Sequence, residues 1–323
     1  MEQTPEEIWK SLQATISDIR RETARVIVGQ QTVVEQMLAA LLCRGHCLLV
    51  GVPGLAKTLL VSTLGQVLGL NFRRIQFTPD LMPSDIVGSE ILQGSAEGSR
   101  RFEFVPGPVF TNLLLADEIN RTPPKTQAAL LEAMQEKQVT VAGTTRNLSE
   151  PFIVYATQNP VEHEGTYPLP EAQLDRFFFQ INIDYPTPAD EEEILRRTAG
   201  PDMPEPQVLL SPDKVLEMQR VVTSVPVPDD IYTLIVKLVQ STRPDSPHAT
   251  DMVRRYVACG AGPRAGQCLV AAARAIAMLR GKFSVSEQEV KAVLLPVLRH
   301  RLIPNYTATG EGVSMEKVID SLM

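Results

Sequence analysis

The chain has 323 residues, of which 44% are apolar and 21% are charged. This balance is typical of a folded globular protein and excludes a disordered or fibrous chain, and the length allows two domains. The net charge of −7 gives no general attraction to phosphate backbones, so protein is a better candidate partner than nucleic acid.

The apolar runs are short. The longest, such as residues 113–116, are far below the roughly 20 residues that cross a bilayer. The chain begins with acidic residues and has no cationic region followed by an apolar stretch, so no secretory signal is expected. We therefore predict a cytoplasmic protein without a membrane span. No CxxC pair is present, which predicts buried free thiols at all four cysteines: Cys43, Cys47, Cys259 and Cys268.

Between residues 44 and 184, short apolar runs alternate with helical patterns. Near-continuous apolar runs separated by helices are typical of a parallel sheet that is covered on both faces. This part of the chain is therefore predicted to be an α/β domain. The expected strands are residues 47–50, 113–116, 152–157 and 178–183.

A glycine-containing loop follows the first of these strands and precedes a helical pattern. It reads GVPGLAKT from Gly51 to Thr58. Backbone N–H groups of such a loop close around a phosphate, while Lys57 neutralises the β and γ oxygens and the Thr58 hydroxyl contacts Mg²⁺. Ala56 stands where the general pattern has glycine. The expected phosphate-binding residues are Gly51, Pro53, Gly54, Leu55, Ala56, Lys57, Thr58 and Leu59.

Two carboxylates end the second strand. Asp117 and Glu118 directly follow the apolar run 113–116. Alone, such a pair would more often be a surface turn, but its position downstream of a phosphate-binding loop favours a catalytic site. At a strand end, one carboxylate can reach the Mg²⁺ shell while its neighbour orients water. Asp117 is predicted as the metal ligand and Glu118 as the general base.

Three further polar residues follow in the order expected of such a site. Asn159 ends the third strand, and an uncharged amide there can hold the attacking water. Arg176 ends a short helix and is the candidate arginine finger, acting in cis or on a neighbour. Arg264 opens a later helix and could reach a nucleotide between domains. Each has a plain alternative: a turn-forming Asn-Pro pair for Asn159, and solvated helix-end positions for the two arginines.

The spacing of apolar residues in the sequence changes after residues 185–188. Apolar residues then recur with helical spacing, as in 231–239 and 290–298. We predict that residues 1–190 form the α/β nucleotide-binding domain and that residues 191–323 form a small all-helical domain.

Together these residues resemble the MoxR family of AAA+ ATPases, in the clade that has an insertion in helix 2. In that family alanine is usual at the position of Ala56, and serine is more common at the position of Gly262. The matching segments are Ile27–Gln30, Gly51–Thr58, Leu115–Arg121, Ala156–Pro160, Leu169–Phe177, Gly262–Ala265 and Val297–Leu302.

The resemblance implies an αβα sandwich with a parallel five-stranded sheet, followed by a helical lid. It also implies a ring, expected to be a hexamer, with ATP and Mg²⁺ at subunit interfaces. Within this scheme Arg176 would act in trans, Arg264 would be a second sensor, and Val28 and Gly29 would lie near the adenine. The helix 2 insertion would span about residues 84–110, and residues 139–146 would form a hairpin.

Family members are thought to remodel, assemble or activate protein complexes, often with a separate partner that contains a von Willebrand factor A domain. Two alternatives stay open. A magnesium-chelatase-like motor subunit shares nearly every ATPase motif, although residues 297–302 favour MoxR. A nucleic-acid-remodelling ATPase would usually carry an added basic domain. The basic pairs at 73–74 and 100–101 are expected to be solvated or to form subunit contacts.

Overall fold

The computed structural model describes residues 5–94, 100–161, 165–200 and 204–322. A five-stranded parallel sheet lies at the centre of the α/β domain, in the strand order β2-β5-β8-β1-β9. All four strands expected from the sequence are present, and β2 completes the sheet at one edge. The strands are β1 Cys47–Val50, β2 Phe72–Gln76, β5 Leu113–Asp117, β8 Ile153–Gln158 and β9 Phe179–Asn182.

Both faces of the sheet are buried, which explains the unbroken apolar runs. Along β5, Leu113 and Leu115 pack into one hydrophobic cluster with α2 (Gln31–Leu42) and α3 (Lys57–Val67). Leu114 and Ala116 point to the opposite face and pack with α5 (Pro124–Glu136). Since successive strand residues alternate between faces, a strand covered on both sides must be apolar throughout.

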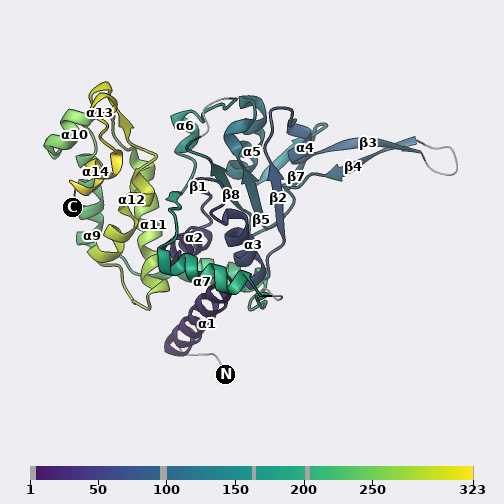
Figure 1. Cartoon of the computed structure of the whole chain (residues 1–323), viewed down its shortest axis with the longest axis horizontal. Coiled ribbons are helices and arrows are strands. Elements are labelled where there is room, and N and C mark those ends of the chain that lie inside the picture. Colours follow the sequence, from purple (N-terminus) through teal and green to yellow (C-terminus); the bar gives the residue numbers. More distant parts are fainter. Residues whose placement is uncertain (1–4, 95–99, 162–164, 201–203, 323) are drawn as a thin grey trace.

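Two hairpins extend the sheet domain. The first follows the short helix α4 (Pro83–Val87) and pairs β3 (Gly88–Gly94) with β4 (Arg100–Pro106); it projects well beyond the body of the molecule (Figure 1). The second pairs β6 (Gln138–Val141) with β7 (Thr144–Asn147). Both lie where the sequence predicts the helix 2 insertion and the later hairpin.

The carboxy-terminal domain is helical, as predicted, with one addition. A short antiparallel pair, β10 (Val257–Cys259) with β11 (Ile303–Pro304), lies among the helices. The chain continues from β9 into α7, whose first residue is Pro188, and the division of the domains near residue 190 stays a prediction. The helices are α7 Pro188–Thr198, α8 Pro212–Ser224, α9 Asp229–Ser241, α10 Asp251–Tyr256, α11 Pro263–Leu279, α12 Glu287–Leu298, α13 Tyr306–Glu311 and α14 Met315–Asp320.

The long amino-terminal helix α1 (Pro5–Val26) joins the two domains (Figure 1). Its first part packs on the lid: the Trp9 ring stacks on Phe283 at a centroid distance of 4.9 Å, and Gln13 Nε2 donates to the carbonyl oxygen of Met278 at 2.8 Å. Farther along, Ile16 and Ile19 enter the main hydrophobic cluster. The helix therefore contacts the lid and the sheet domain at once.

One expectation about the cysteines is wrong. Cys47 and Cys268 are buried and Cys43 is partly buried, but the free thiol of Cys259 is exposed. Cys259 ends the short strand β10 on its solvent side, an environment that the surrounding alanine and glycine did not reveal. Separately, no helix within the described ranges is both long and apolar enough to span a membrane.

Candidate functional site: a nucleotide pocket at the end of the sheet

The phosphate-binding loop connects β1 to α3, as its sequence predicts. Lys57 is the first residue of α3, and its Nζ donates to the carbonyl oxygens of Gly51 and Val52 at 2.7 and 2.8 Å. A Cβ at Gly51 would lie 2.7 Å from the carbonyl oxygen of Ile183, so glycine is required there for the loop to pass close to β9. The loop thus curls around the lysine ammonium at the amino-terminal end of a helix.

Ala56 adopts a left-handed backbone conformation, with φ of 52°. A non-glycine residue in this region is strained by about 1–2 kcal/mol. The departure from the general pattern therefore stores strain directly beside Lys57.

We expect Ala56→Gly to stabilise the chain. Relief of the left-handed strain outweighs the extra entropy of an unfolded glycine by about 0.5–1 kcal/mol, a rise of about 1–4 °C in Tm. The matched control is Ala128→Gly on the exposed face of α5, which removes no strain and should lower Tm. Differential scanning fluorimetry of the three chains measures the effect. Equal losses of Tm in both variants would contradict it.

The two carboxylates lie at the carboxyl end of β5 and are tied to neighbouring strands. The buried Thr157 hydroxyl donates to Asp117 Oδ1 at 2.6 Å and accepts from the Glu118 N–H at 2.8 Å. Arg74 donates to Asp117 Oδ2 through Nη2 at 2.6 Å, and Gln76 Nε2 donates to Glu118 Oε2 at 2.8 Å. Arg74 is exposed, as expected of a basic residue on a solvated face, and β2 also places it against Asp117, a contact that the sequence did not predict.

These contacts hold the two carboxylates in different directions. Glu118 has a left-handed φ of 58°, which turns the chain away from β5 directly after Asp117. Its Oε2 also lies 3.1 Å from Arg121 Nε. Gln76 and Arg121 therefore orient the carboxylate of Glu118, the predicted base. Thr157 and Arg74 orient the carboxylate of Asp117.

Lysine and carboxylates share one electrostatic environment. Burial lowers the pKa of Lys57 from its ordinary value, and the negative charges of Asp117 and Glu118 oppose this shift. The phosphate-binding loop and the acidic strand end are thus parts of a single site. The donor chemistry fits Mg²⁺, because Asp117 Oδ1 accepts one hydrogen bond and keeps a second lone pair, and Thr58 adds a hydroxyl at the start of α3.

Asn159 lies where predicted, beyond the end of β8 and between the loop and the acidic pair in strand order. Its side chain is largely buried, and Oδ1 accepts from the N–H of Val161 at 3.1 Å. That bond is the one expected of a turn-forming asparagine. The sensor role of Asn159 stays a prediction, and it requires the amide to face the nucleotide.

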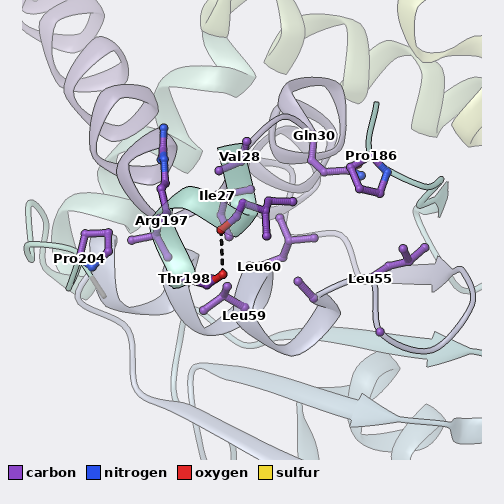
Figure 2. Close-up of a pocket in the computed structure, with 14 residues that line it drawn as sticks. Ile27, Val28, Gln30, Leu55, Leu59, Leu60, Pro186, Arg197, Thr198 and Pro204 are labelled. Carbon is purple, nitrogen blue, oxygen red and sulfur yellow. Dashed lines mark hydrogen bonds between the residues drawn. The ribbon is translucent and has the colours of Figure 1, made fainter. Parts of the chain in front are cut away.

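A mostly apolar pocket adjoins the loop (Figure 2). Its walls come from the junction of α1 and α2, from the loop with α3, and from α7. Val28 lines it, as predicted; Gly29 instead lines an adjacent pocket, where a Cβ would lie 2.9 Å from the Asp190 carboxylate. Lining residues that sequence reasoning did not identify include Ile27, Leu60, Pro186, Ile194 and Thr198.

The two candidate arginines are linked through Asp175, which precedes Arg176 in the chain and pairs with Arg264. Neither Arg176 nor Arg264 is among the described residues that line the apolar pocket. Arg264, at the start of α11, donates through Nη1 to Asp175 Oδ2 at 3.3 Å, directly beside Arg176. Both arginines are exposed. The order of the motifs along the sequence identifies both arginines as candidates. It does not show that Arg264 contacts the residue next to Arg176.

A parallel sheet of this order, a phosphate-binding loop after β1, a paired carboxylate after β5 and a helical lid define a P-loop ATPase of the AAA+ class. Residues 46–179 match the family described as "ATPase family associated with various cellular activities (AAA)", and residues 249–322 match the AAA lid domain.

Relatives are similar over nearly the whole chain. Chaperone MoxR1 of Mycobacterium tuberculosis is 47% identical over 302 residues, which cover 94% of this chain and 79% of MoxR1. Protein YeaC of Bacillus subtilis is 43% identical over 302 residues, covering 93% and 90%. A crystal structure from Cytophaga hutchinsonii matches with a TM-score of 0.92 and 42% identity, covering 98% of this chain and 96% of that one. The chain belongs to the MoxR family of AAA+ ATPases.

Proposed function

We propose that this ATPase works as a ring, expected to be a hexamer, that hydrolyses ATP between subunits and uses the energy to remodel, assemble or activate partner protein complexes. The observation that supports the ring is that Arg176 and Arg264 are both exposed on the surface, where a neighbouring subunit can reach them. Exposed arginines are suited to bind a phosphate that a neighbouring subunit supplies.

We propose the following roles for the residues of one site. Lys57 leaves the carbonyls of its own loop to neutralise the β and γ phosphates, and the loop N–H groups orient them. Glu118, held by Gln76 and Arg121, accepts a proton from the attacking water. Thr58 and Asp117 would hold Mg²⁺, which neutralises phosphate charge when bound. Asn159 would position the water, and Val28 and Ile27 would contact the adenine.

We propose that Arg176 acts on the nucleotide of the next subunit and that Arg264 is a second sensor. AAA+ family members typically form rings, and the 47% identity to a protein named as a chaperone supports protein complexes as the target. We further propose that a separate protein with a von Willebrand factor A domain and a client complex are the partners. A magnesium-chelatase-like motor is the alternative with the most similar site.

A mixing experiment tests the shared site. Arg176→Ala removes the finger and leaves the pocket intact, whereas Glu118→Gln disables the pocket and leaves the finger intact. Each variant alone is expected to be inactive in steady-state ATP hydrolysis, and an equimolar mixture is expected to regain activity, since mixed rings contain intact interfaces. The control is a mixture of Glu118→Gln with Lys57→Ala, both pocket defects, which should stay inactive. Normal turnover by Arg176→Ala alone, independent of protein concentration, would overturn the ring proposal.

A further inference from the structure

The segment that carries Arg176 is held by the lid. Arg301, which lies just beyond α12, donates through Nη2 to the carbonyl oxygens of Asp175 and Phe177 at 3.2 and 2.7 Å. Its Nη1 donates to the carbonyl oxygen of Phe178 at 3.3 Å, and its Nε donates to Asp175 Oδ1 at 2.8 Å. One guanidinium thus binds the backbone on both sides of Arg176.

Arg301 is itself fixed. Its side chain is only 2% exposed, and it also donates to the carbonyl oxygen of Val297 in α12 and to Cys268 Sγ in α11. A guanidinium is planar and presents its donors in a rigid fork, so a buried one with several acceptors has little freedom. His300 adds a contact, since its Nε2 lies 3.0 Å from the carbonyl oxygen of Phe177. The lid therefore clamps the carbonyls of this segment.

The sheet domain fixes the same segment less directly. The Phe178 N–H donates to the carbonyl oxygen of His46 at 2.7 Å, where β9 begins, and the Arg176 N–H donates to Gln173 at 3.1 Å. The Arg176 guanidinium itself makes a long bond of 3.4 Å to the carbonyl oxygen of Leu131. The sheet domain also buries the Phe177 side chain completely, while the lid binds the backbone carbonyls on either side of Arg176.

Asp175 connects this clamp to the second exposed arginine. Its Oδ1 accepts from the buried Arg301, and its Oδ2 accepts from Arg264, whose side chain is half exposed. The carboxylate of Asp175 therefore binds two lid arginines, the buried Arg301 and the exposed Arg264, and it is carried by the residue that precedes Arg176. Asp175 therefore connects the lid to the segment that carries Arg176.

We propose that Asp175 and Arg301 are positioning residues for Arg176, and that they tie the arginine finger to the lid, so that the lid of one subunit sets hydrolysis at the neighbour's site. This inference rests on the proposed trans role of Arg176. Both residues contact the segment that carries Arg176, so their loss is expected to affect turnover more than nucleotide binding.

The test uses Asp175→Asn, which keeps the size of the side chain and removes its charge, and Arg301→Lys, which keeps the charge and removes the fork. Both should lower kcat for ATP at least about tenfold, with KM and the Kd for a fluorescent ATP analogue changed less than about twofold. Asp245→Asn, at an exposed loop position, is the control and should have normal kcat. Circular dichroism and Tm check that each variant folds.

Mixing then separates a finger defect from general damage. Asp175→Asn subunits should regain activity when mixed with Glu118→Gln, which supplies an intact finger, and should not regain it with Arg176→Ala, which shares the defect. Recovery with Arg176→Ala, or no recovery with either partner in a folded variant, would overturn the positioning role. If the Arg176→Ala and Glu118→Gln mixture itself fails to recover, the ring proposal has failed instead, so the two outcomes are distinct.

Discussion

Replacing Glu118 with glutamine is expected to lower kcat for ATP hydrolysis by about 10²–10⁴-fold while ATP still binds. The amide keeps the size of the side chain and can keep an oxygen facing Gln76 and Arg121, so the local structure should persist. It cannot accept a proton from water. The change therefore removes one chemical step and leaves the loop, the apolar pocket and Lys57 in place.

The measurement is steady-state hydrolysis together with equilibrium binding of a fluorescent ATP analogue. Glu132→Gln on the exposed side of α5 is the matched control and should behave as the native chain does. A kcat for Glu118→Gln within about threefold of native would show that another group accepts the proton. Loss of nucleotide binding would instead show that Glu118 supports the pocket.

Replacing Arg176 with alanine is expected to lower kcat by about 10³–10⁵-fold, the range known for arginine fingers. The residue is exposed and makes one long bond to Leu131, so the free energy of unfolding should change by less than about 0.5 kcal/mol. ATP affinity should stay within about twofold, because the side chain is absent from its own subunit's pocket.

Arg220→Ala on the exposed side of α8 serves as the control for removing a surface arginine. Hydrolysis by Arg176→Ala should also stay low at every protein concentration, whereas the native chain should gain turnover as rings assemble. A kcat that is native at saturating protein would remove Arg176 from the chemistry. The same assay applied to Arg264→Ala reports on the second exposed arginine.

The sequence predicts the architecture well because the signals are local. A fully apolar strand such as residues 113–116 requires cover on both faces, and the structure has it. The loop from Gly51 to Thr58 depends on a strand, a turn and a helix start that follow each other in the chain. The strand β2 was missed, since Phe72–Gln76 has two exposed arginines and lacks the apolar run of an interior strand.

Only part of the site could be predicted, because many of its side-chain contacts join residues that are distant in the sequence. Asp117 and Glu118 are visible as a pair that ends a strand, but Thr157 and Arg74 reach them only through pairing of β5 with β8 and β2. Such contacts join positions about 40 residues apart, which a pattern along one chain does not reveal. Asp175 and Arg301 are farther apart still, in different domains. Cross-strand and cross-domain partners need the fold.

The helix α1 forms a second connection between the two domains, separate from the chain that joins β9 to α7. Its 22 residues span about 33 Å at 1.5 Å per residue. Trp9 stacks on Phe283 near one end of the helix, and Val26 forms part of the pocket wall at the other end. A helix of this length behaves as a stiff rod over such a distance, so we expect a tilt of the lid to displace this wall. If the base of ATP binds there, opening of the lid would also loosen the base.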